Sequence, residues 1–347
     1  MKLRHWLALG GGVLGAIGAG IALNSFLPKK FATTYIDTTK QENTHVLLPG
    51  TATKSPATAE TDIDVTFLRC GSVVVPELMA VRGAFSLAPH RISHSAVLIR
   101  HPKGTFLYDS GLCADIELFL MDQPWFFFQT RGKFKLEMSI RDHLQHLNMK
   151  PKDLDFVLLS HLHWDHVAGI PDLEGVPLRI NELEFDAANQ GLLDRDHQLV
   201  RHLLSNNPFT LFNLTGPAYE GFRSSYDLFG DGSVVIVPLP GHTTGHIGTF
   251  INRVNGPRLF LIGDAAWTVD NYTRPATMHP FLWSLVTSDD ATARQTLIEL
   301  HNFAQQHPEV PLIAMHDAHL QNSFMQIEQE RRRTQKKISD PTINKDI

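Results

Sequence analysis

Short apolar runs, each ending at a polar cluster, recur along the chain from residue 62 to about residue 326. The runs "SAVLIR" (95–100) and "TFLYDSG" (105–111) flank the turn-forming tetrapeptide "HPKG" and therefore predict a β-hairpin. Further strands are expected in five segments where aliphatic and β-branched residues dominate: "DIDVTFLRCGSVVV" (62–75), "LDFVLLS" (154–160), "GSVVIVPLPGH" (232–242), "RLFLIGDAAW" (258–267) and "VPLIAMHDAH" (310–319).

Helical patterns lie between these strands, around residues 137–148, 192–205 and 289–306. Ser288 and Asp289 are N-cap candidates for the third of these helices. Strands mixed with helices, with apolar runs that suit sheets covered on at least one face, indicate an α/β domain built in layers.

The two ends of the chain have a different composition. In residues 1–27, two basic side chains precede an uncharged apolar stretch about long enough to span a bilayer, which predicts a signal peptide or a membrane anchor. Residues 28–61 are rich in Thr, Ala, Lys and Pro and predict a flexible linker, whereas residues 327–347 predict a polar charged tail. We therefore expect a folded domain at 62–326 that is exported, either periplasmic or attached to the inner membrane through its N-terminal segment.

Composition limits the possible functions. The 347 residues are 43 % hydrophobic and 19 % charged, as in folded globular proteins, and the net charge of −5 gives no electrostatic basis for binding nucleic acid. Cys70 and Cys113 are the two cysteines, which excludes a cysteine zinc finger and a disulfide framework. The sequence leaves open whether these two pair in an exported domain or occupy separate core positions.

Metal-ligating side chains follow the predicted strands. Loops held by a rigid sheet are the usual place for a preorganised site. Five such strand ends carry a residue that can bind a metal: Asp109, His161, His242, Asp264 and His316.

The motif "HLHWDH" at 161–166 places three more ligands beside His161. His161 and His163 point the same way on extended backbone, whereas Asp165 and His166 diverge unless the chain turns there. A turn into a helix would direct the first pair to one ion and the second pair to another. Imidazole and carboxylate without thiolate suit zinc, and also iron or manganese.

With "HLHWDH", "PGHTTGH", "GDAAW" and "LYDSG" as its motifs, the sequence resembles the metallo-β-lactamase-fold hydrolase superfamily over roughly residues 62–325. These motifs are most similar to the branch that includes N-acyl-homoserine lactonases. The resemblance implies a four-layer αββα sandwich and two divalent metal ions. It also implies the ligands: His161, His163 and His242 for the first ion, Asp165, His166 and His316 for the second, with Asp264 bridging, and with Asp109 and His246 in support.

Two cations that share a water lower its pKa from about 15.7 to about 7, so that hydroxide can attack a carbonyl at neutral pH. The family architecture places Asp165 where it can accept or relay the proton. The resemblance thus implies hydrolysis of a small-molecule ester or lactone, with an acyl-homoserine lactone as one possibility. The alternatives are a hydrolase of another class, acting on a thioester or a β-lactam, and a non-catalytic metal-binding protein that retains the fold.

The substrate pocket is less defined by the sequence. Some lactonases of this branch carry a tyrosine three residues after the bridging Asp, where this chain has Trp267; its indole N–H or the hydroxyl of Tyr272 is the candidate donor to a substrate carbonyl. The aromatic run "DQPWFFFQT", with Trp125 and Phe126, lines an acyl-chain pocket, dips into a membrane surface or packs as core. His90, His94 and His143 belong to no motif and are expected to be surface or core residues.

Overall fold

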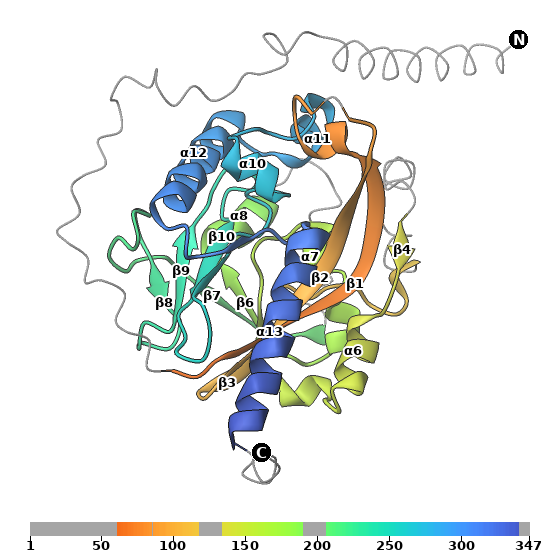
Figure 1. The fold of residues 1–347 in the computed structure, drawn as a ribbon, viewed down its shortest axis with the longest axis vertical. Coiled ribbons are helices and arrows are strands. Elements are labelled where there is room, and N and C mark those ends of the chain that lie inside the picture. The colour runs from red at the N-terminus through yellow and green to blue at the C-terminus, as the bar shows by residue number, and fades with distance from the viewer. Residues whose placement is uncertain (1–60, 85, 118–133, 190–205, 340–347) are drawn as a thin grey trace, which may run out of the picture.

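Two β-sheets form the centre of the computed structural model, which describes residues 61–84, 86–117, 134–189 and 206–339 (Figure 1). The first sheet has the strand order β4-β1-β2-β3-β5-β6-β7. Its strands are β1 (Asp64–Pro76), β2 (Pro89–His101), β3 (Gly104–Tyr108), β4 (Lys135–Leu136), β5 (Phe156–Leu158), β6 (Leu178–Asn181) and β7 (Phe209–Phe212). The pairs β1–β2 and β2–β3 are antiparallel, and β3, β5, β6 and β7 run parallel.

The second sheet has the strand order β12-β11-β10-β9-β8, with one parallel pair between β11 and β12. Its strands are β8 (Tyr226–Asp227), β9 (Val234–Pro238), β10 (Ile247–Ile251), β11 (Leu259–Leu261) and β12 (Leu312–Ile313). The strand segments expected from the apolar runs are therefore confirmed, including the hairpin that turns at residues 101–104.

Helices cover the outer face of each sheet. The first sheet is covered by α6 (Ile140–His146), α7 (Trp164–Val167), α8 (Glu182–Asn189) and the 3₁₀ turn η2 (Ile170–Leu173). Another 3₁₀ turn, η1 (Pro151–Asp153), precedes β5. The second sheet is covered by α10 (Val269–Thr273), α11 (Pro280–Val286) and α12 (Asp290–Gln306). The short α3 (Glu77–Ala80) follows β1, and α13 (Ala318–Ser339) is the last described helix. The four-layer αββα sandwich is confirmed.

The helices expected around residues 137–148 and 289–306 correspond to α6 and α12. Ser139 caps α6 by accepting a hydrogen bond from the backbone amide of Asp142, and Asp289 caps α12 by accepting one from Thr292. Asp289 is therefore the cap of α12, and Ser288 precedes it. The helix expected at 192–205 lies outside the described residues.

Alternation along the central strands divides the core into layers. In β3, Leu107 packs toward the helices on the first sheet, whereas Phe106 and Tyr108 pack toward the second sheet. Side chains point to opposite faces at every second residue of a strand, so a strand buried on both faces reads as a continuous apolar run. A third apolar layer joins the second sheet to α12, where Phe303 packs against aromatic residues of the strands.

The two cysteines occupy separate core positions. Cys70 and Cys113 are free thiols, and burial raises the pKa of each to about 12. Both thiols are therefore protonated at neutral pH and behave as small apolar side chains.

The helix α13 continues past residue 326, where the domain was expected to end. Phe324 packs into the layer between the two sheets, and Glu328 is fully buried against Arg253, with Nη2 2.6 Å from Oε1. The boundary expected at 326 therefore falls inside a packed helix. Among the charged residues that follow position 326, Glu328 has its charge paired with that of Arg253 inside the molecule.

The expected signal peptide or anchor (1–27) and linker (28–61, apart from its last residue) lie outside the described residues, as does the end of the tail after residue 339. Among the described residues no helix is both long enough and apolar enough to cross a membrane. Export and membrane attachment stay predictions from the sequence.

The buried Arg253–Glu328 pair gives a stability test. Removing one partner of a buried ion pair leaves an uncompensated charge, which costs about 3–5 kcal/mol. We therefore expect Glu328→Gln to lower the free energy of unfolding by about 3 kcal/mol in urea titration. The control is Arg274→Gln, which breaks the exposed pair with Asp270 and should change the stability by less than about 1 kcal/mol. Equal effects of the two variants would contradict a packed C-terminal helix.

Candidate metal centre

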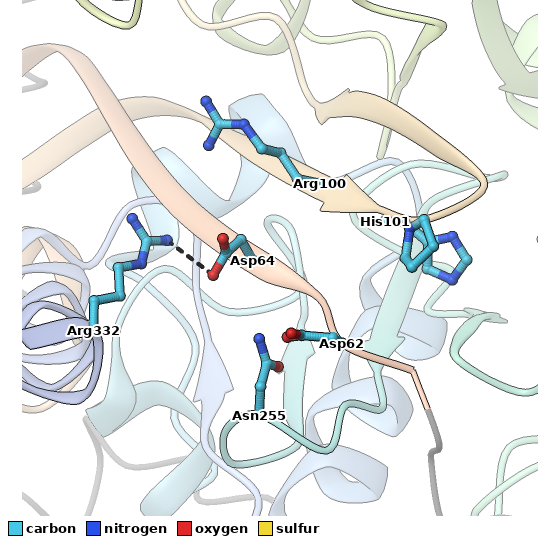
Figure 2. A pocket seen from close by; sticks show the side chains of 7 residues that line it. Asp62, Asp64, Arg100, His101, Asn255 and Arg332 are labelled. Carbon is cyan, nitrogen blue, oxygen red and sulfur yellow. Dashed lines mark ion pairs between the residues drawn. The ribbon is translucent and has the colours of Figure 1, made fainter. Parts of the chain in front are cut away.

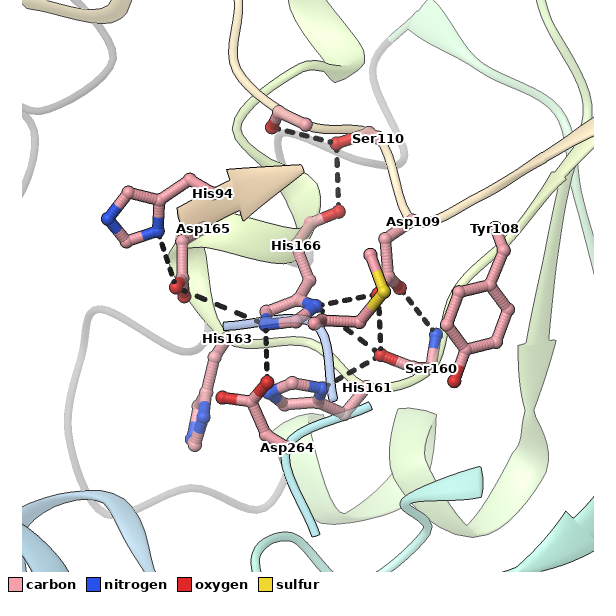
Figure 3. Close-up of polar contacts among 12 residues, drawn as sticks. His94, Tyr108, Asp109, Ser110, Ser160, His161, His163, Asp165, His166 and Asp264 are labelled. Carbon is pink, nitrogen blue, oxygen red and sulfur yellow. Dashed lines mark hydrogen bonds and ion pairs between the residues drawn. The ribbon is translucent and has the colours of Figure 1, made fainter. Parts of the chain in front are cut away.

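The expected ligands meet at one edge of the two sheets. Asp109 follows β3 and His161 follows β5, and because these strands are parallel their C-terminal ends lie side by side. In the second sheet, the β9–β10 loop carries His242, and the C-terminal ends of β11 and β12 are followed by Asp264 and His316. Figure 3 shows the side chains of His161, Asp165, His166 and Asp264 pointing toward one another.

Three histidines form the first ligand group. One ligand nitrogen from each of His161, His163 and His242 lies within 4.8 Å of the others, and His163 Nδ1 is 2.9 Å from His242 Nε2. Burial, reinforced by the neighbouring histidines, lowers the pKa of both His161 and His242 well below its ordinary value. These two rings are therefore neutral at pH 7, the form in which imidazole binds a metal.

Two carboxylates and two histidines form the second group. His316 Nε2 lies 2.9 Å from Asp264 Oδ2 and 3.3 Å from Asp165 Oδ2. His166 Nε2 is 3.2 Å from Asp264 Oδ1, and His242 Nε2 is 3.6 Å from Asp264 Oδ2. Asp264 thus contacts members of both groups, which is the position that a bridging carboxylate needs.

The charges of this group are unusual for a buried site. Burial alone would lower the pKa of His166, but the carboxylates of Asp264, Asp109 and Asp165 outweigh it and hold that pKa well above its ordinary value. The pKa of His316 is also raised against its burial, by Asp264 and Asp165. Buried carboxylates at such distances need compensating positive charge, which protons or a cation can supply.

Asp109 orients the second group from beneath. Its carboxylate accepts hydrogen bonds from His166 Nδ1 at 2.7 Å, from the Ser160 amide at 2.8 Å and from Ser160 Oγ at 3.0 Å. Ser160 Oγ in turn lies 3.0 Å from His161 Nδ1. One buried carboxylate therefore fixes His166 directly and His161 through Ser160, so that each ring presents Nε2 to the centre.

The backbone of Asp109 has φ of 59°, in the left-handed region that aspartate tolerates better than most residues. The three hydrogen bonds of its carboxylate hold this conformation. Its expected supporting role is consistent with these contacts.

His246 holds the backbone of Asp264. His246 Nε2 accepts the amide hydrogen of Asp264 at 2.9 Å, and burial lowers the pKa of His246 to about 3, which keeps the ring neutral. Gly263 precedes with φ of 52°, and a Cβ there would lie 2.5 Å from His246 Nε2. A glycine is therefore required at this turn.

Glu184 on α8 is a supporting residue that the motifs did not identify. It is 4 % exposed, and its carboxylate accepts the Leu162 amide at 2.9 Å and the Gly245 amide at 3.0 Å. These amides belong to the ligand loops of different sheets. Glu184 therefore joins the two halves of the centre, and no local pattern around it signals this role.

His94, expected to be a surface or core residue outside the site, lies within it. One of its ring nitrogens lies close to Asp165 and His316, with the three atoms within 4.8 Å of one another. The sequence carries little signal of this placement, because His94 stands alone on a strand and is 71 residues away from Asp165.

Of the four expected pocket residues, Trp267 lies at the centre. Its indole Nε1 donates to Asp264 Oδ2 at 3.2 Å, and its ring meets that of His316 edge-on. Tyr272 does not line the site: it is 5 % exposed in the core beneath α12, and its hydroxyl donates to the Leu312 carbonyl. Trp125 and Phe126 lie outside the described residues.

The donor set fits divalent metal ions. Imidazole nitrogens form the first group, a mixture of imidazole and carboxylate forms the second, and no cysteine contributes to either. His161 Nε2 is buried and has no hydrogen-bond partner among the described residues, as expected of an atom directed at a metal. This donor chemistry suits zinc and also accommodates iron or manganese.

A separate polar hollow of about 460 Å³ lies at the opposite edge of the first sheet (Figure 2). It is lined by Arg100 and His101 at the end of β2, Asp62 and Asp64 around the start of β1, and Arg332 on α13. Arg332 pairs there with Asp64. The hollow contains none of the expected ligands, so it has no part in the metal centre.

An αββα sandwich with a histidine–aspartate centre at the edge of its sheets defines a class of metal-dependent hydrolases. A model of the metallo-beta-lactamase superfamily matches residues 91–294, more than half of the chain. The chain belongs to this superfamily, which confirms the resemblance found in its motifs.

Several relatives are lactonases. N-acyl homoserine lactonase AttM of Agrobacterium fabrum is 24 % identical over 271 residues, which cover 74 % of this chain and 94 % of AttM. An N-acyl homoserine lactonase of Bacillus cereus is 26 % identical over 144 residues, 42 % of this chain and 51 % of the lactonase. These matches confirm the expected branch of the superfamily.

Solved structures show the same fold. An N-acyl homoserine lactone hydrolase with the product N-hexanoyl-L-homoserine at its catalytic metal centre superposes with a TM-score of 0.58 at 18 % identity, covering 77 % of this chain and 97 % of that one. A mutant of B. thuringiensis AiiA with N-decanoyl-L-homoserine at its active site gives the same TM-score and coverage.

Asp109→Asn tests the support beneath the second group. Asparagine keeps the shape and tolerates the backbone conformation, but it removes the charge that holds His166. Loss of such an outer partner typically costs 10–100-fold in metal affinity, so we expect zinc to bind about 10–100-fold more weakly in chelator competition. Asp227→Asn is the control, because Asp227 accepts two backbone amides in a distant turn. Unchanged zinc affinity in Asp109→Asn would refute the role.

Zinc binding should release protons at pH 7. The raised pKa of His166 means that its ring is protonated when metal-free, and a metal at Nε2 must displace that proton. The apparent zinc affinity should therefore rise with pH, by up to about tenfold per pH unit for each proton displaced. Calorimetry in two buffers of different ionisation enthalpy measures the release. Zinc binding independent of pH between about 6 and 8 would contradict this charge balance.

Proposed function

We propose that this chain is a dinuclear metal-dependent hydrolase that opens an acyl lactone, with N-acyl homoserine lactones as the substrate class. The observation that carries the proposal is the pair of ligand groups, one of three histidines and one containing Asp165 and His316, with Asp264 in contact with both. A single ion would leave one of these buried groups without a partner.

The named relatives support the choice of substrate. The match to AttM spans nearly the whole length of that lactonase, so the likeness is not confined to the metal motifs. A lactone is an ester whose cleavage leaves the alcohol attached to the product. One site must therefore polarise the attacked carbonyl and also stabilise the leaving oxygen.

Two divalent ions held by these residues would supply a water of lowered pKa and would polarise the ester carbonyl. The chain's own residues set the geometry for that chemistry. Burial would raise the pKa of Asp165, but His166, the hydrogen bond from His94 and His316 together hold it below its ordinary value. Asp165 is therefore ionised at neutral pH and can accept a hydrogen bond from water or relay a proton toward the leaving oxygen.

Trp267 borders the centre through its contacts with Asp264 and His316. Because its indole N–H donates to Asp264, that donor is engaged with the bridging carboxylate and is not directed at a substrate carbonyl. The Tyr272 hydroxyl is engaged in the core. Polarisation of the carbonyl would therefore depend on the metal ions, and the indole ring forms an apolar wall beside His316.

The proposal is tested by metal content and a substrate screen on the full chain. We expect two equivalents of zinc per chain and hydrolysis of acyl-homoserine lactones, followed by pH-stat titration of the acid released. Asp165→Ala should reduce kcat/KM by at least about 10²-fold, because it removes both a ligand and the proton acceptor. Arg274→Gln, at the exposed C-terminal end of α10, should leave the rate unchanged.

The same screen distinguishes the alternatives. Cleavage of nitrocefin or of a thioester in the absence of lactone turnover would assign the chain to another hydrolase class. A full complement of two metals without turnover of lactone, thioester or β-lactam would favour a metal-binding protein that retains the fold.

A further inference from the structure

His94 lies on the face of β2 that is turned toward the metal centre. His94, Ala96 and Leu98 stand at every second position of β2 and therefore share one face of the strand. Ala96 and Leu98 pack beneath the helices of the first sheet. β1 pairs His94 with Gly71 and Ser95 with Arg69, so the residue between Arg69 and Gly71 is an extra one in the ladder. A bulge of this kind bends a strand and redirects its side chains, and it is common beside active sites.

The imidazole of His94 is fixed on several sides. It is 5 % exposed, and Nδ1 donates to Asp165 Oδ2 at 3.1 Å (Figure 3). The rings of Trp164 and His316 lie with their centroids 5.3 Å and 5.4 Å from that of His94, and Phe134 lies at 5.6 Å. A side chain enclosed in this way has few rotamers available, so the direction of its N–H is set before any ion binds.

The neighbouring residue of β2 holds another ligand of the same group. The Ser93 carbonyl accepts a hydrogen bond from His316 Nδ1 at 2.6 Å, and the Ser93 amide donates to the His316 carbonyl at 3.0 Å. Two consecutive residues of one strand therefore contact two different ligands, Asp165 and His316. The first sheet reaches both through β2, although the two ligands come from α7 and from the loop after β12.

We propose that His94 is a positioning residue for the second metal ion, which it serves by fixing the rotation of the Asp165 carboxylate. The inference rests on the dinuclear centre of the proposed function. A carboxylate that can rotate about the bond to its own carbon can present either oxygen, and a hydrogen bond from a rigid ring selects one orientation. Partners of this kind are worth about 10–100-fold in metal affinity.

Two substitutions distinguish the contribution of the His94 N–H donor from that of its aromatic ring. His94→Phe keeps an aromatic ring among Trp164, Phe134 and His316 but has no donor. His94→Asn keeps an amide N–H near the position of Nδ1 but has no ring. His101→Phe is the matched control, because His101 is a buried histidine of the same strand that contacts Ser233 at the far edge of the sheet.

The experiment measures stepwise zinc affinity by competition with a chromophoric chelator, and the visible absorption of the cobalt-substituted protein. We expect His94→Phe to weaken the second equivalent about 10–100-fold with the first unchanged, and to shift the cobalt bands of the second site. His94→Asn should restore affinity and bands to near those of the unsubstituted chain, and His101→Phe should change neither.

Three results would overturn the proposal. Unchanged binding in His94→Phe would show that Asp165 is oriented without His94. Weak binding in His94→Asn but not in His94→Phe would assign His94 to packing. Weak binding in both variants, at an unfolding midpoint equal to that of the unsubstituted chain, would indicate that the ring nitrogen itself is a ligand. A single zinc equivalent in the unsubstituted chain would instead refute the dinuclear centre on which the proposal rests.

Discussion

The structure depends on two buried carboxylates that require positive charge. Asp264 is 3 % exposed and Asp165 is 8 % exposed, and the nitrogens of His166 and His316 lie close to them. Moving such charges out of water costs several kcal/mol each unless a partner compensates them. The fold meets this requirement by bringing histidines from both sheets to one edge, where protons or divalent cations can supply the charge.

The centre is shared between the sheets, so the contacts between their loops determine its geometry. Glu184 joins the Leu162 and Gly245 amides. Asp109 holds His166 from the first sheet, and His246 holds the Asp264 backbone from the second. Rigid sheets supply the positions, and these buried hydrogen bonds supply the orientation that metal coordination requires.

Sequence patterns predicted the parts of this arrangement that are local. Strands buried on both faces read as continuous apolar runs, so the strands followed from the residue pattern. The αββα sandwich and the seven expected ligands were what the resemblance of the motifs implied, and the structure brings those seven side chains to one edge of the sheets. His94 and Glu184 were not predicted, because their roles arise from contacts with residues far away in the chain: Asp165 is 71 positions from His94, and Gly245 is 61 positions from Glu184.

Tyr272 was misassigned because closeness to Asp264 in the chain does not fix which way α10 turns its side chains. The domain boundary at 326 was placed too early because a charged helix segment resembles a solvated tail until the burial of Glu328 against Arg253 is known.

Anomalous diffraction from crystals grown with zinc tests the dinuclear centre most directly. We predict two peaks at the zinc absorption edge, one among His161, His163 and His242 and one among Asp165, His166 and His316, about 3.5–4 Å apart with Asp264 between them. A single peak at full occupancy, with the second ligand group still closed by hydrogen bonds, would contradict a centre built for two ions.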